Sequence, residues 1–138
     1  MTEFDWRAYL NHAFSTLQLP PQEPEEPEGE ARRRSAVSRG YDALHNVARE
    51  YAALHMSFKA DEADKAHWQL IKLMRAGSTE EKNVSQTLDE MRRFRNMADY
   101  DEISFLFSYF QVRSMLFQIQ KAIATLEVLR KRREAAKR

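Results

Sequence analysis

A single run of apolar residues near the C-terminus constrains the fold more than any other feature of this sequence. Its side chains recur at alternating intervals of four and three residues, at Phe105, Tyr109, Val112, Leu116, Ile119, Ile123 and Leu126. This spacing follows one face of an α-helix. We therefore predict one long helix, from about residue 101 or 102 to about residue 134.

A second apolar stripe lies beside the first on the same segment, at Ile103, Leu106, Phe110 and Phe117. One stripe is enough to dock a helix on a core, so two stripes indicate burial from two sides. Either this helix lies at the centre of the bundle, or its second side faces another copy of the chain, and we favour the second in part. The predicted homodimer interface consists of Phe105, Tyr109, Val112, Leu116, Phe110 and Phe117.

The rest of the chain also favours helices. It has only three Gly, and its four Pro all lie between Pro20 and Pro27, so the special turns of a sandwich or barrel are missing. We predict helices at 2–18 and 31–58, a third ending at Arg75, and a fourth whose capping box pairs Ser78 with Glu81. The expected class is all-α: an antiparallel up-and-down bundle of four to five helices in a single domain, 1–138, with a Pro/Glu linker at 20–30 and the main bundle at 31–134.

Composition and charge exclude several classes of function. The absence of cysteine excludes disulfides, thiolate catalysis and cysteine-ligated zinc. The four His do not have metal-site spacing, and we expect no metal and no cofactor. A net charge of +1 argues against a general polyanion binder. No apolar run approaches the roughly 20 residues of a membrane span, and the first residues do not resemble a secretory signal, so we expect a cytoplasmic protein without membrane contact.

Two segments are polar where a plain bundle does not require it. Ser38, Asp42, His45 and Arg49 share one face of the second predicted helix, and Arg92, Arg93 and Arg95 precede Asn96, Asp99 and Tyr100 in the fourth. An arginine cluster beside Asp and Tyr can bind a phosphate and place an acid or base near it, or it can simply be an ion-paired helix end. We expect His67 to be solvent-exposed. The basic segment 130–138 suits the helix dipole or, alternatively, RNA phosphates.

Two of these stretches carry a family resemblance. Residues 36–48 read AVSRGYDALHNVA and residues 88–101 read LDEMRRFRNMADYD. Together they resemble the HEPN superfamily of prokaryotic helical domains, over about residues 31–130. The family's second-helix pattern matches Arg39, Tyr41, Leu44 and His45, and the Arg-Asn-x-Ala-Asp-Tyr signature of one small-protein branch matches Arg95, Asn96, Ala98, Asp99 and Tyr100.

The resemblance implies a dimeric helical bundle from a toxin–antitoxin or defence-type system, often beside a nucleotidyltransferase-type partner protein. Many relatives are metal-independent endoribonucleases, in which an Arg holds the scissile phosphate and a His acts as acid or base. In this chain Tyr100 takes the place of that His, and tyrosine, with a pKa of about 10, is a poor base at neutral pH. The resemblance thus points to Arg95, Tyr100 and His45 as catalytic residues, to Arg95, Asn96 and Arg39 as phosphate-binding residues, and to Asp99, Asp42 and Tyr41 as supporting residues.

The function expected from the sequence is binding of RNA or nucleotide phosphate in a dimer cleft, with degenerate catalysis. One alternative is an active metal-independent endoribonuclease that uses the same cleft. The other is a non-catalytic protein-interaction bundle.

Overall fold

The computed structural model describes residues 5–17, 27–59, 63–100 and 108–137. Within these ranges the chain forms helices and no strand, as the sequence predicts. The helices are α1 (Trp6–Leu17), α2 (Pro27–His55), α3 (Ala63–Arg75), α4 (Thr79–Tyr100) and α5 (Tyr109–Ala136). The predicted all-α bundle with a long C-terminal helix is confirmed.

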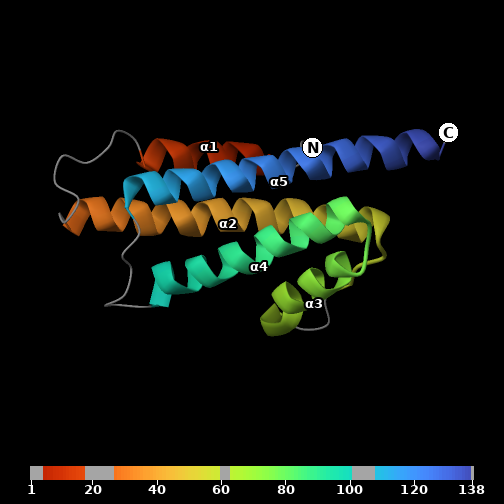
Figure 1. Ribbon diagram of the computed structural model, residues 1–138, viewed down its shortest axis with the longest axis horizontal. Coiled ribbons are helices and arrows are strands. Elements are labelled where there is room, and N and C mark those ends of the chain that lie inside the picture. The colour runs from red at the N-terminus through yellow and green to blue at the C-terminus, as the bar shows by residue number, and fades with distance from the viewer. Residues whose placement is uncertain (1–4, 18–26, 60–62, 101–107, 138) are drawn as a thin grey trace.

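Helices α1, α2, α4 and α5 alternate in direction along the chain (Figure 1). Helix α2 runs through the centre, with α1 and α5 on one side and α4 on the other, while α3 packs against α4. This arrangement places one face of α2 against α3 and α4, and another face against α1 and α5. The two faces of α2 carry different residues, and only the first bears the site described below.

Several predicted helix boundaries are wrong. Helix α1 begins at Trp6 rather than at residue 2. Helix α2 begins at Pro27, so the last residues of the predicted 20–30 linker are helical, and it ends at His55 rather than at residue 58. Proline is tolerated in a first helical turn because its missing N–H has no helical partner there. Helix α5 begins at Tyr109 rather than at 101 or 102, because Ser108 is extended and forms a capping box with Gln111. Residues 20–26 and 101–107, which include Phe105, lie outside the described residues.

The main apolar stripe of α5 faces the protein's own core. Its buried members from α5 are Val112, Leu116, Ile119, Ile123 and Leu126. The close approach of α5 to α2 depends on Gly40, because a Cβ there would lie 2.6 Å from Cδ2 of Leu116. Val112 and Leu116 are therefore unavailable to a second subunit, which corrects the predicted dimer interface. Tyr109 is partly buried against the same core.

The second stripe of α5 remains largely uncovered within the chain. Phe110 is 66% exposed and Phe117 is 48% exposed. Phe117 contacts Phe14 of α1, with 5.1 Å between ring centroids. Helix α1 therefore covers this side only in part.

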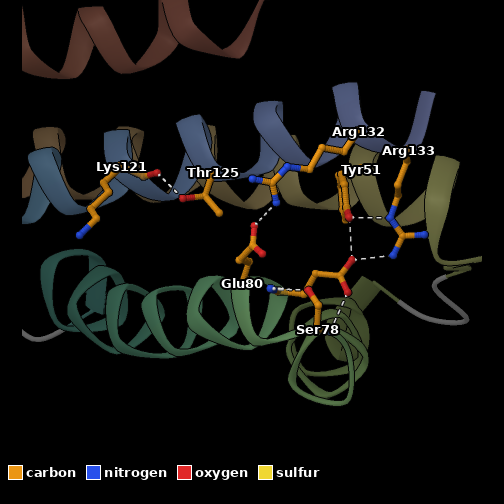
Figure 2. A network of polar contacts seen from close by, with 8 residues as sticks. Tyr51, Ser78, Glu80, Lys121, Thr125, Arg132 and Arg133 are labelled. Carbon is orange, nitrogen blue, oxygen red and sulfur yellow. Dashed lines mark hydrogen bonds and ion pairs between the residues drawn. The ribbon is translucent and has the colours of Figure 1, made fainter. Parts of the chain in front are cut away.

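A buried polar network joins the C-terminal end of α5 to α2 and α4 (Figure 2). Arg133 donates from Nε to the hydroxyl of Tyr51 at 2.9 Å and from Nη2 to Oε2 of Glu81 at 3.0 Å. Tyr51 donates to the same carboxylate oxygen at 2.6 Å. The other oxygen of Glu81 accepts the backbone N–H of Ser78 at 2.9 Å, which confirms the predicted capping box. Glu81 is thus fully engaged, and the basic end of α5 serves at this position to hold the bundle together.

None of the helices found in the described ranges is long and apolar enough to cross a lipid bilayer.

Candidate functional site

Three helices bring two histidines, a tyrosine and an arginine together on the α3–α4 side of α2. The ring of His45 from α2 stacks on that of His67 from α3, with centroids 4.0 Å apart and an interplanar angle of 20°. The hydroxyl of Tyr41 and Nδ1 of His67 are hydrogen-bonded at 2.6 Å. The guanidinium of Arg95 from α4 lies over the Tyr41 ring, 5.1 Å from its centroid. We call this group, with Arg49 and Arg92, the Arg–His cluster.

Both histidines of the Arg–His cluster are neutral near physiological pH. Burial is the main cause, and it lowers the pKa of His45 to about 3 and that of His67 to about 4. Three guanidinium groups within electrostatic reach of both rings lower these pKa values further, those of Arg49, Arg92 and Arg95. Burial also raises the pKa of Tyr41, so its hydroxyl stays protonated. The cluster therefore carries positive charge on its arginines alone.

The arginines of the cluster are unequally engaged. Arg95 forms a long ion pair with Asp99, with 3.6 Å from Nη1 to Oδ2, and its buried Nε has no hydrogen-bond partner. Neither Arg49 nor Arg92 makes a hydrogen bond or ion pair with a described residue. A guanidinium is a planar group of five donors that matches the oxygens of phosphate. Two uncommitted guanidinium groups beside neutral histidines leave donor capacity for an anion.

Acidic residues border the cluster but do not neutralise it fully. Oδ2 of Asp99 accepts the hydroxyl of Ser38 at 3.3 Å in addition to pairing with Arg95. Burial raises the pKa of Asp42, and the charge of Asp99 adds to this effect while Arg95 opposes it. Asp42 and Asp99 thus both interact with Arg95.

Some of the residues nominated from the sequence lie together in the structure, and others do not. Arg95, His45, Tyr41, Asp42 and Asp99 lie together. Three other nominated residues do not join them. Arg39 donates from Nε to Ser35 Oγ at 3.1 Å and lies 5.8 Å from the Tyr9 ring centroid, on the α1 side of α2. Asn96 is exposed, and Tyr100 is 75% exposed.

His67 is the cluster residue that sequence reasoning missed. We expected it in solvent, but it is half-buried, stacked on His45 and bonded to Tyr41. Spacing within a helix shows which residues share a face of that helix, whereas the meeting of His45 and His67 depends on how α3 crosses α2. The available signal was the apolar face of α3 at Leu70, Ile71 and Met74, which fixes the side of α3 that is turned inward.

The Arg–His cluster extends from the buried side chains of Tyr41 and His45 to the exposed Arg49. A groove of about 400 Å³ lies elsewhere, between α4 and α5, and it is lined by none of the nominated residues. Within the described ranges no three His, Asp or Glu side chains are grouped so that they could hold a metal ion. The cluster itself offers guanidinium, imidazole and phenol groups.

No protein-family model, no curated protein and no solved structure matches this chain.

Proposed function

We propose that the chain binds a phosphate-bearing ligand at the Arg–His cluster, and that this ligand is RNA or a nucleotide. The single observation that carries the proposal is the pair of uncommitted guanidinium groups, Arg49 and Arg92, beside the stacked neutral rings of His45 and His67. Charge-assisted hydrogen bonds from arginine are among the strongest available to a phosphate. The resemblance to HEPN domains supports the same ligand class and suggests a toxin–antitoxin or defence-type system, in the cytoplasm, with a nucleotidyltransferase-type partner protein.

We propose further that catalysis at this cluster is degenerate. An imidazole whose pKa is about 3 holds a proton too weakly to act as an effective base near neutral pH. Tyr100, at the position where the family has its catalytic histidine, faces solvent, 75% exposed. The alternative of an active endoribonuclease requires Arg95 and His45 to act without it. Incubation of total RNA with the pure protein in the presence of EDTA separates the two. Intact RNA supports the proposal, whereas cleavage that His45→Asn abolishes would establish the endoribonuclease.

The phosphate proposal is tested by comparing two neighbouring arginines. Arg92→Gln removes a guanidinium of the cluster, while Arg93→Gln removes the same charge from a side chain that is 75% exposed and paired with Asp89. Fluorescence anisotropy with a labelled single-stranded RNA measures both. We expect Arg92→Gln to weaken binding roughly tenfold and to reduce the logarithmic salt slope by about 0.7, the change expected for one lost phosphate contact. Equal effects of the two substitutions would show that binding depends only on overall charge.

We also propose that two copies associate through the outer face of α5. Phe110, Phe117 and Val128 are exposed by 66%, 48% and 48%, and on a helix they lie within roughly 20° of one another. Large exposed apolar side chains along one line are typical of a protein–protein contact. This face replaces the predicted one, because Val112 and Leu116 belong to the core. The interaction-bundle alternative instead relies on the acidic linker at 20–30 and the basic segment at 130–138 to dock partners.

A further inference from the structure

The outer face of α3 carries an exposed tryptophan among basic residues, which packing of the bundle does not explain. Four exposed side chains, Lys65, Trp68, Lys72 and Arg75, fall on one line along this helix and span roughly 80° of its circumference. The opposite face of α3 packs on the core, where Leu70, Ile71 and Met74 are fully buried. Trp68 is nevertheless 44% exposed. We call these four residues the α3 stripe.

The aromatic ring of the stripe is already paired with a cation. The guanidinium of Arg75 lies 5.4 Å from the ring centroid of Trp68. Arg75 is itself held by Asp89 of α4, with 3.9 Å from Nη2 to Oδ2. An arginine stacked on one face of an indole fixes the orientation of the ring and enriches its surroundings in positive charge. Part of the indole stays accessible to solvent, since Trp68 is 44% exposed.

The residues around Trp68 indicate whether this surface binds a protein or a nucleic acid. A protein-docking surface surrounds its aromatic anchor with further apolar side chains. On the α3 stripe the neighbours of Trp68 are three cations, Lys65, Lys72 and Arg75. An isolated exposed ring among positive charges is the pattern with which proteins stack an unpaired base and hold the adjoining phosphates. The basic segment 130–138 lacks this pattern, because it has no aromatic residue.

We propose that the α3 stripe binds an unpaired nucleotide of a single-stranded nucleic acid, with the base stacked on Trp68 and the phosphates bound by Lys72 and Arg75. The stripe adjoins the Arg–His cluster, because His67, the residue before Trp68, turns into that cluster on the same helix. One strand that crosses α3 can thus contact both surfaces. The inference rests on the proposed function in one respect, namely that the ligand carries phosphates.

The intrinsic fluorescence of Trp68 provides a direct test. The chain has two tryptophans, and Trp6→Phe leaves Trp68 as the only emitter. In this background we add oligouridine, oligodeoxythymidine and an RNA duplex in separate titrations. We expect both single strands to quench the emission and the duplex to have little effect, since its bases are already stacked. A stronger response to one single strand than to the other distinguishes RNA from DNA as the source of the nucleotide.

Affinity measurements with labelled oligouridine complete the test. We expect Trp68→Ala to weaken binding by roughly 5- to 100-fold, the range expected for loss of one stacked base, and Trp68→Phe to retain most of the affinity. Both variants replace an exposed side chain, so they should remain folded. Absence of quenching, or equal affinity of Trp68→Ala and wild type, overturns the inference. An emission change that follows the protein concentration and not the added nucleic acid also overturns the inference. Such a change would identify the α3 stripe as a contact between two copies of the chain.

The design also separates this inference from the proposed function. If Arg92→Gln weakens oligouridine binding and Trp68→Ala does not, the phosphate site stands and the stacking site is wrong. If only Trp68→Ala has an effect, the stripe binds nucleotides without help from the Arg–His cluster. Whenever the α3 stripe takes part in binding, Lys72→Ala should reduce the dependence of affinity on salt concentration, because one phosphate contact is lost.

Discussion

The imidazole rings of His45 and His67 stack at 4.0 Å although the two residues belong to different helices. Their contact joins α2 to α3 at the point where the arginines of α4 also converge. The contact disfavours a charge on both rings at once, since two adjacent imidazolium ions would repel each other. Protonation of His45 and His67 should therefore change both the stability of the bundle and the charge of the candidate site.

The first prediction concerns the stability of the protein in mild acid. Burial lowers the pKa of His45 to about 3 in the folded protein, whereas an unfolded histidine has a pKa of about 6.5. Below about pH 6.5 the unfolded chain thus binds the extra proton, and the free energy of unfolding should fall as the pH decreases toward the folded value, by about 1 kcal/mol per pH unit. His67 should add less, because it is half-exposed and screened by solvent.

Urea unfolding at a series of pH values measures this dependence. The double variant His45→Gln with His67→Gln should flatten the curve between about pH 6 and pH 4. His12→Gln, on the exposed side of α1, serves as the control and should leave the slope unchanged. A double variant with the same slope as the wild type would show that carboxylates alone govern the acid response.

The second prediction compares two adjacent arginines of α5. Arg133→Ala leaves the carboxylate of Glu81, which is 2% exposed, without its cation, and should lower the free energy of unfolding by about 2 kcal/mol. This figure is below that for a fully buried pair because the Arg133 side chain is 42% exposed. Arg132→Ala breaks an exposed pair with Glu80 and should cost less than about 1 kcal/mol. Urea unfolding of both variants checks the difference, and similar losses would contradict it.

The third prediction addresses the association of two copies. If the outer face of α5 forms the interface, Phe110→Glu should convert a dimer into a monomer, because it places a charge among buried apolar side chains. Leu54→Glu is the matched control, since Leu54 is an exposed apolar residue of α2 away from that face. Sedimentation equilibrium gives the mass of each. A wild-type monomer, or a dimer in both variants, would exclude this interface.

The fourth prediction concerns the end of α2. Ser57 has a φ of 55°, in the left-handed region, and the N–H of Phe58 donates to the carbonyl of Ala52 at 3.1 Å. Glycine is favoured at such a helix end because it has no Cβ. Ser57→Gly should therefore raise the free energy of unfolding by about 1 kcal/mol. Ser57→Ala, which keeps the Cβ, should bring no gain in the same urea experiment, and a gain equal to that of glycine would refute the explanation.

The sequence predicts the helices well where apolar residues repeat without interruption. The stripe from Val112 to Leu126 is buried as expected, and the capping box of Ser78 and Glu81 is present. Helix ends were less predictable, because Pro27 and Ser108 both sit at helix starts through backbone geometry that periodicity does not encode. Apolar periodicity thus defines each helix but not its limits, which depend on capping residues such as Ser78 and Ser108.

The candidate site was only half predictable for a related reason. His45 and Arg95 were nominated from their positions in the sequence, and they do meet across α2 and α4. Arg39 was nominated with them, but it lies on the other side of α2, where it contacts Ser35 and Tyr9. His67 was overlooked because its partners come from another helix. Contacts between helices depend on crossing geometry, and that information is spread over the whole core.

The network around Arg133 has a consequence for the order of folding events. Its partners Tyr51 and Glu81 are 82 and 52 positions away along the chain. Closing such long loops costs entropy before any contact forms, so these bonds should appear after the rate-limiting barrier. Loss of Arg133 should then leave the refolding rate almost unchanged and accelerate unfolding. The C-terminal end of α5 would then mainly slow unfolding, and so determine the lifetime of the native state.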